Sequence, residues 1–87
     1  MLTKTIAILN PSGLHMRPAG LFVKTVTPFQ SEVLFTIRDS EYNAKSMISV
    51  LSAMVKSGDE IELRISGADE QACMDAVVSA IESGLGE

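Results

Sequence analysis

The sequence predicts an α+β domain of two layers, with its elements in the order β-α-β-β-α-β-α. Two segments alternate apolar and polar residues, the period of a strand with one buried face. Three others repeat apolar residues every three or four positions, which is typical of amphipathic helices. One apolar face per strand predicts a sheet that helices cover on one side and water meets on the other.

The first strand and the first helix are predicted from the N-terminal third of the chain. Residues Leu2 to Leu9 are rich in β-branched and aliphatic side chains, which favours a strand. Four turn formers follow at residues 10–13. Pro18 suits the first turn of the next helix, and Pro28 closes that helix. The apolar stripe of this helix is Ala19, Phe22, Val23 and Val26.

A hairpin and a short helix are expected in the middle of the chain. Alternation over residues 33–37 predicts a second strand, and Arg38-Asp39-Ser40 predicts a turn into a short strand near residues 41–44. Ser46 is placed to cap the second helix, because a hydroxyl there can accept from free backbone N–H groups. The stripe of this helix is Met47, Val50, Leu51 and Met54.

The last third supplies a turn at residues 57–59, a strand over residues 60–66 with the clearest alternation, and a final helix. Asp69 is predicted to cap this helix, and Gly84 to stop it. The side chains that it is expected to bury are Cys73, Ala76, Val77, Ala80 and Ile81.

Composition narrows the class of protein. The 87 residues are expected to form one domain spanning positions 1–87, and 46% of them are hydrophobic. A formal net charge of −4 argues against nucleic acid as a partner, although Arg17, Lys24 and Lys45 could form a local basic spot. The single cysteine, Cys73, excludes an intrachain disulfide. With no secretory signal and no membrane-spanning run, we expect a cytoplasmic protein.

His15, the only histidine, stands just ahead of the first predicted helix. A helix N-terminus has free N–H groups and partial positive charge, so it stabilises anions such as phosphate. Arg17 can add a guanidinium suited to phosphate oxygens, and Gly13 allows a tight turn beside the ring. A partly unprotonated imidazole can attack a phosphoryl donor. This arrangement predicts phosphoryl transfer through His15.

A simpler interpretation is that His15 is an exposed residue at a helix start with no chemistry. Other chemistries have less support. One histidine and one cysteine cannot supply the three or four ligands of a zinc site. Ser12 lies near His15, but no third orienting group is evident. No glycine-rich phosphate loop is present, and no cofactor is implied.

Two separated segments resemble one protein family. Residues 13–19, Gly-Leu-His-Met-Arg-Pro-Ala, are similar to the active-site signature of HPr, the histidine-containing phosphocarrier of the bacterial sugar phosphotransferase system. Residues 43–48, Asn-Ala-Lys-Ser-Met-Ile, resemble the regulatory-serine segment of HPr from Gram-positive bacteria. The likeness covers essentially the whole chain in length and element order. It implies an open-faced β-sandwich, four antiparallel strands with three helices on one face.

The resemblance also implies a function. His15 would accept a phosphoryl group from phosphorylated Enzyme I, on the ring nitrogen Nδ1, and donate it to the A domains of sugar permeases. Arg17 would stabilise the phosphate. The protein would then be a carrier with a transient phosphohistidine rather than an enzyme. We expect it to act as a monomer.

The same resemblance implies regulation at Ser46, through phosphorylation by a dedicated ATP-dependent kinase, the HPr kinase/phosphorylase. A phosphate there would repel an acidic partner such as Enzyme I, and in Gram-positive relatives it creates a surface for a catabolite-control repressor. We expect Met16 and Met47 to be exposed, and Leu51 to be partly buried. The implied partner-binding residues are Met16, Gly20, Lys24, Lys45, Met47, Ile48 and Leu51.

Some positions depart from the family pattern. Met16 is bulkier than usual, Gly20 replaces a commoner alanine or threonine, and Ser49 and Met54 stand where glycine is frequent. These differences leave the phosphoryl chemistry intact but put the set of partners in doubt. Two other hypotheses stay open. One is a specialised paralogue that acts mainly as a regulatory binding protein through Ser46. The other is a small binding domain with no phosphoryl role, for which substitution of His15 and Ser46 would change nothing.

Overall fold

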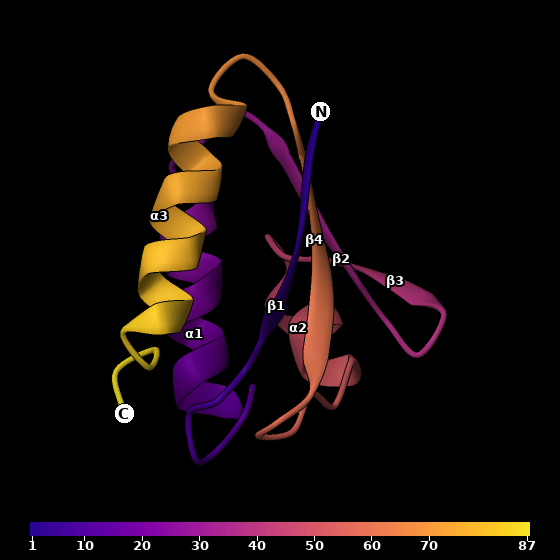
Figure 1. Cartoon of the computed structure of the whole chain (residues 1–87), viewed down its shortest axis with the longest axis vertical. Coiled ribbons are helices and arrows are strands. Elements are labelled where there is room, and N and C mark those ends of the chain that lie inside the picture. Colours follow the sequence, from indigo (N-terminus) through magenta and orange to yellow (C-terminus); the bar gives the residue numbers. More distant parts are fainter.

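A four-stranded antiparallel sheet, backed on one face by three helices, makes up the computed structural model, which describes residues 1–87 (Figure 1). The strand order is β1-β4-β2-β3, so the last strand in the chain lies inside the sheet. The element order β-α-β-β-α-β-α confirms the predicted fold class. The elements are β1 (Leu2–Ala7), α1 (Met16–Val26), β2 (Glu32–Ile37), β3 (Ser40–Asn43), α2 (Met47–Ser52), β4 (Glu60–Ser66) and α3 (Glu70–Glu82).

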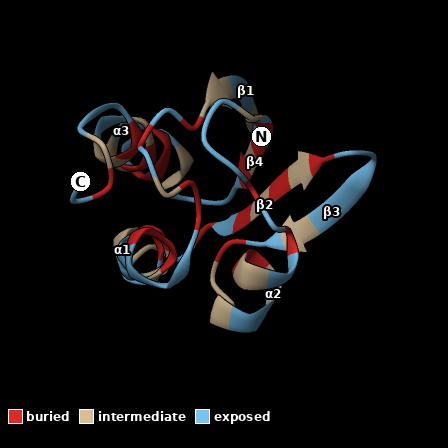
Figure 2. Ribbon diagram, turned by 90° about the horizontal axis from the view of Figure 1, so that it is seen from below, coloured by how far each residue is buried: buried red, intermediate tan, exposed pale blue.

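Side-chain alternation sets which face of the sheet is buried. Ile61, Leu63 and Ile65 of β4 are fully buried, whereas Glu60 and Glu62 between them are exposed. On β2, Val33 and Phe35 pair with Ile65 and Leu63, so the apolar residues of both strands share one face. Figure 2 shows the three helices on that side of the sheet, with their buried surfaces turned towards the strands.

The core lies between this face and the helices. Phe22 of α1 packs edge-on against Phe35 of β2, with ring centroids 5.7 Å apart. Val50 of α2 and Val77 of α3 are also fully buried. In α3 the structure buries Cys73, Val77 and Ile81 as predicted, but the methionine at position 74 is buried too, and Ala76 and Ala80 are only half-buried. The buried face of α3 is therefore rotated slightly about the helix axis from the predicted one, towards Met74 and away from Ala76 and Ala80.

The first strand and the second helix are shorter than predicted. At Ile8 the backbone leaves the β1–β4 pairing and bonds instead to the turn before β4, where its N–H donates to Asp59 and its carbonyl accepts from Gly58. Leu9, predicted to end the strand, is exposed instead. The second helix ends at Ser52, so Met54 lies beyond it, with φ at 51° and its side chain exposed.

The hairpin and the helix caps show how local sequence places the ends of elements. Arg38 and Asp39 both have positive φ, and Ile37 pairs directly with Ser40, so the loop has two residues rather than the predicted three. The hydroxyl of Ser46 accepts from the N–H of Ser49 at 3.2 Å, which confirms the predicted cap of α2.

The predicted cap of α3 is only half right. Asp69 occupies the N-cap position, but its carboxylate makes no bond to the helix. It accepts instead from the backbone N–H groups of Gln30 and Ser31, each at 2.9 Å, and from the Ser31 hydroxyl. Three donors of the loop after α1 thus occupy the carboxylate, at a place where the fold brings that loop beside the helix start.

Candidate functional site

His15 occupies the N-cap position of α1 with an extended backbone, at φ −71° and ψ −178°. Its carbonyl accepts from the N–H of Ala19 at 2.8 Å, which begins the helix. The imidazole makes no capping bond, and the residue is exposed. The ring is therefore free to react with a group that approaches from solvent, while the backbone beneath it is fixed by the helix.

The loop that carries His15 is held from two sides. The N–H of Leu14 donates to the carbonyl of Val55 at 3.0 Å, and the Asn10 side chain donates to the carbonyl of Gly13 at 2.8 Å. Gly13 has φ at 61°, and a Cβ at this position would overlap the carbonyl oxygen of Val55. Only glycine allows this close approach, which fixes the position of the histidine relative to the segment after α2.

The start of α1 offers positive charge beside the ring. The backbone N–H groups of Met16 and Arg17 lie in the first turn and have no partner within the helix. Pro18 has no N–H to add, and the guanidinium of Arg17 lies on an exposed residue. These groups together favour an anion at His15.

A carboxylate also reaches this loop. Glu87 accepts from the Asn10 side chain and from the backbone N–H of Ser12, each at 2.9 Å. Hydrogen bonding from Ser12, and then from Asn10, holds the pKa of the Glu87 carboxyl below its usual value, and the charge of Arg17 adds to this effect. The site therefore combines positive groups at the helix start with the negative charge of Glu87, which is hydrogen-bonded to the preceding loop.

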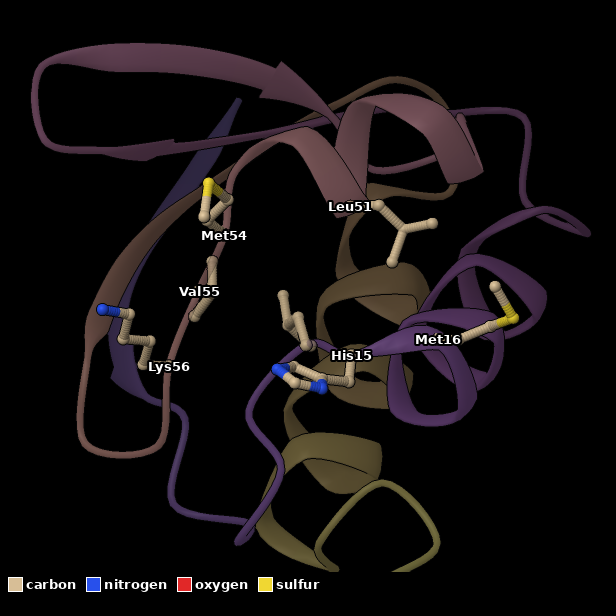
Figure 3. Close-up of a pocket in the computed structure, with 7 residues that line it drawn as sticks. His15, Met16, Leu51, Met54, Val55 and Lys56 are labelled. Carbon is tan, nitrogen blue, oxygen red and sulfur yellow. The ribbon is translucent and has the colours of Figure 1, made fainter.

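A hollow of about 300 Å³ opens beside His15 (Figure 3). The imidazole points into the space between α1 and the segment that follows α2. Apolar side chains form most of the lining, and no carboxylate takes part in it. Its lining residues are Leu14, His15, Met16, Leu51, Met54, Val55 and Lys56.

The predicted docking residues differ in exposure. Met16 is 71% exposed and Ile48 is 80% exposed. Leu51 is half-buried, which confirms the mixed environment predicted for it. The prediction that Met47 is exposed is wrong, because its side chain packs against the core and lies half-buried. Gly20 is half-buried, and the nearest atom to a Cβ placed there is the terminal methyl of Met47, at 3.9 Å.

The two lysines predicted to bind partners do not lie together at His15. Lys24 is exposed in the last turn of α1, about 14 Å along the helix axis from the histidine. Lys45 is half-buried, and its ammonium donates to the carbonyl of Phe29 at 2.5 Å. Their part in partner binding stays a prediction.

Several residues of the site have no local signal in the sequence. The sequence predicts Asn10 only as a turn residue and gives no signal for Glu87 or Lys56. The bonds of Glu87 join residues 75 and 77 positions apart, which no local pattern reveals. Residue clusters that could hold a metal ion are absent, with no group of three His, Cys, Asp or Glu side chains coming together.

The chain as a whole is similar to one known protein family. A family model described as the PTS HPr component phosphorylation site matches residues 2–83. The chain belongs to the HPr phosphocarrier family. The two segments that resemble HPr, residues 13–19 and 43–48, thus lie within a match that covers nearly the whole chain.

Individual HPr proteins are similar along their whole length. The phosphocarrier protein HPr of Neisseria meningitidis is 39% identical over 87 residues, covering 100% of this chain and 98% of that protein. The crystal structure of HPr-C-His from Thermoanaerobacter tengcongensis superposes with a TM-score of 0.97 and 40% identity, over 100% of this chain and 98% of that one. An HPr dimer from the same organism, also 40% identical and covered to 100% in both chains, gives a TM-score of 0.80.

The family also contains HPr-like proteins. The HPr-like protein Crh of Halalkalibacterium halodurans is 37% identical over 82 residues, covering 94% of this chain and 98% of that protein. Members of the HPr family are phosphocarriers of the phosphotransferase system, acting as carriers rather than catalysts. None of the helices in the structure has the length and apolar character needed to cross a membrane.

Proposed function

We propose that this chain accepts a phosphoryl group on His15 from phosphorylated Enzyme I and donates it to the A domains of sugar permeases. The observation that carries the proposal is the placement of His15. An exposed imidazole stands at the N-terminus of an 11-residue helix, with Arg17 in the first turn and an open hollow beside the ring. This is the position at which a helix stabilises added negative charge.

In the accepting step, a neutral ring nitrogen attacks the phosphorus atom. A nitrogen–phosphorus bond forms on His15 as the bond between phosphorus and Enzyme I breaks, and the electron pair of that bond stays with Enzyme I. Following the family resemblance, we assign the attacking nitrogen as Nδ1. Arg17 and the free N–H groups of the first turn favour the added oxygens electrostatically. The donating step runs in the reverse sense, onto a permease domain.

The test is an intact-mass measurement after incubation with phosphoenolpyruvate and Enzyme I. We expect the parent to gain one acid-labile phosphoryl group and the His15→Ala variant to gain none. Gln71→Ala, an exposed substitution on α3, is the matched control and should behave as the parent. A parent that gains no phosphoryl group, beside a working carrier in the same reaction, would contradict the proposal.

We further propose that phosphorylation of Ser46 regulates this cycle. Ser46 stands at the start of α2, next to the exposed Ile48 and near the hollow that Leu51 lines. A phosphate on its hydroxyl would add negative charge where an acidic partner approaches. The HPr kinase/phosphorylase with ATP should modify the parent and not Ser46→Ala, and the product should be a poorer substrate of Enzyme I. Ser52→Ala, in the same helix, serves as the control.

We place the working protein in the cytoplasm as a monomer. The histidine, the arginine and the hollow of the site all come from one chain, so a partner copy has nothing to complete. Light scattering during size-exclusion chromatography should give a mass near 9.3 kDa. A stable species of twice that mass would contradict the assignment.

A further inference from the structure

The two edge strands of the sheet differ in how far their backbones are occupied. β3 has only four residues, and the N–H of its last residue, Asn43, donates to the hydroxyl of Ser49 at 2.8 Å. β1 has six residues, pairs with β4 in an unbroken register, and has no strand on its other side. An edge strand of this kind presents a row of free N–H and C=O groups to which another strand can bond.

The hydrogen-bond pattern shows which residues of β1 carry these free groups. Ile8, directly after the strand, bonds through both its N–H and its carbonyl to the turn before β4. Bonding alternates along an antiparallel strand, so the even-numbered residues of β1 bond to β4 as well. The N–H and carbonyl groups of Thr3, Thr5 and Ala7 therefore point to the open edge. The side chains of both threonines are exposed, so nothing covers this edge.

A groove runs along the helix side of this edge, between β1 and α3. It consists of two hollows, of about 590 and 630 Å³, whose linings share Glu82 and Ser83. Lys4 lines one hollow and Ile6 lines the other, so the groove follows the strand. Figure 2 shows β1 and α3 on one side of the molecule, and α1 and α2 on the other. The groove shares no lining residue with the hollow beside His15.

Carboxylates predominate on both faces of the β1 edge. Asp75 and Glu82 of α3 line the groove, are exposed, and take part in none of the three ion pairs of the structure. Lys4 is the only cation in the lining of the groove. On the open face of the sheet, Glu60 and Glu62 of β4 are exposed beside the last residues of β1. A strand that pairs with β1 therefore meets negative charge on both of its faces.

This charge distinguishes between possible occupants of the edge. A second copy of the chain would bring the same carboxylates against these, and like charges across a strand pair are destabilising. Lys4 adds a further barrier, because a charged side chain on an edge strand opposes self-pairing. A basic segment is attracted instead. Its lysine or arginine side chains can lay their apolar stems along Val78 in the groove and reach Asp75 or Glu82 with their charged ends.

We propose that the edge of β1 is a docking site for an extended, basic segment of another protein, which adds a fifth strand to the sheet. The backbone of the segment bonds to the free N–H and carbonyl groups of β1, and its basic side chains pair with Asp75 and Glu82. Backbone bonds of this kind supply affinity for any extended chain, and the carboxylates select a basic one. The binding uses no chemistry at His15, so it is independent of the function proposed above.

The first experiment titrates the isotope-labelled protein with an acetylated and amidated octapeptide of alternating lysine and valine, followed by NMR. Valine favours the extended conformation, and lysine supplies the charge. We expect the backbone N–H signals of Thr3, Thr5 and Ala7 to shift, because each gains an acceptor. The N–H signals of Lys4 and Ile6, which already bond to β4, should shift less. The result is an alternating pattern along the strand.

Two control peptides separate the backbone from the charge. Replacing each valine by proline keeps the charge but prevents a regular strand, so binding should weaken by about tenfold or more. Replacing each lysine by glutamate keeps the strand but reverses the charge and should abolish binding. Equal affinity for the lysine–valine and lysine–proline peptides would overturn strand addition, and equal affinity for the glutamate–valine peptide would overturn the selection of a basic segment.

The second experiment changes the protein. Thr5→Pro removes one outward N–H without removing a bond to β4, so the lysine–valine peptide should bind roughly tenfold more weakly at a similar urea midpoint. Glu82→Lys reverses a charge of the groove in the last turn of α3, where a cation suits the helix dipole. It should weaken binding roughly fivefold, and less at high salt. Glu32→Lys makes the same charge change on β2, outside the groove, and should have the smaller effect.

Several results would overturn the proposal. One is a parent that does not bind the lysine–valine peptide, or binds it with shifts confined to α1 and α2. Another is an equal effect of Glu82→Lys and Glu32→Lys, which would show that only net charge matters. If the N–H signals of β1 move with protein concentration before any peptide is added, the occupant is a second copy rather than a basic partner. Should Thr5→Pro fail to fold, the lysine–proline peptide on the parent decides the same point.

Discussion

Asp69 and Glu87 lie before and after α3, and each uses a carboxylate to hold a loop next to α1. Asp69 holds the loop after α1, by accepting from Gln30 and Ser31. Glu87 holds the loop before α1, by accepting from Asn10 and Ser12. The two ends of α3 lie at opposite ends of the molecule in Figure 1, so the contacts are far apart.

The two contacts differ in what lies around them. Ser31 is fully buried, and Gly67 packs against it so closely that a Cβ would lie 2.6 Å from its Cα. Glu87 is exposed. His15, which follows the loop that Glu87 contacts, is exposed as well. The same carboxylate chemistry thus supports the fold at one end and supports the proposed site at the other. Changes at the Asp69 end should reduce stability, whereas changes at the Glu87 end should alter the loop locally.

The largest effect is expected from Gly67→Ala. Gly67 has φ at 153°, and the added methyl would displace Ser31 from Asp69. We expect the free energy of unfolding to fall by about 2–4 kcal/mol in urea titrations. Gly58→Ala is the control, because Gly58 also has positive φ but nothing lies within 4 Å of its Cβ position. Equal losses in the two variants would show that backbone strain, not the contact with Ser31, decides the cost.

Ser31→Ala should come next. Removing the buried hydroxyl takes one donor from the Asp69 carboxylate and should cost about 1–3 kcal/mol in the free energy of unfolding. Ser12→Ala, at the other end, should stay within about 0.5 kcal/mol of the parent, because the contact between Ser12 and Glu87 is exposed and the backbone N–H of residue 12 can still donate to the carboxylate. A larger loss for Ser12→Ala would reverse the comparison.

Acid should weaken both contacts. Hydrogen bonding from Ser31, and then from Gln30, lowers the pKa of the Asp69 carboxyl from its usual 3.8. A carboxyl with a lowered pKa in the folded state contributes stability above its unfolded pKa and loses it as pH falls through the folded pKa. Parental stability should therefore decline below about pH 4. In Asp69→Asn this decline should be shallower, as measured by urea unfolding from pH 6 downwards, and an unchanged slope would contradict the role of Asp69.

The smallest effect on global stability is expected from Glu87→Gln. The amide can still accept from Ser12, but it loses the charge that strengthens the bond. We expect a nearly unchanged urea midpoint and a several-fold faster hydrogen exchange of the Ser12 backbone N–H. The Ser31 N–H is the internal control and should exchange at the parental rate. Faster exchange at both positions would mean that Glu87 supports the whole fold.

The contrast between these regions also explains what the sequence could predict. The strand at residues 60–66 and the Ser46 cap depend on neighbours a few positions away, and both were predicted correctly. The apolar period continues through Met54, but the helix ends at Ser52. Just beyond that end, Arg38 from the β2–β3 hairpin donates from its guanidinium to the carbonyl of Ala53. The carboxylates of Asp69 and Glu87 accept hydrogen bonds from residues 38 to 77 positions away in the sequence. Local patterns contain no information about such partners.

The position of β4 inside the sheet has a consequence for synthesis of the chain. β1 pairs only with β4, and β2 reaches β1 only through β4. During translation, β1 and the His15 loop leave the ribosome long before β4, the strand with which β1 pairs. Until residue 66 has emerged, the backbone of β1 has no strand to bond to, and the early segments remain open to water or to chaperones. The sheet can therefore be completed only after the ribosome has translated about three quarters of the chain.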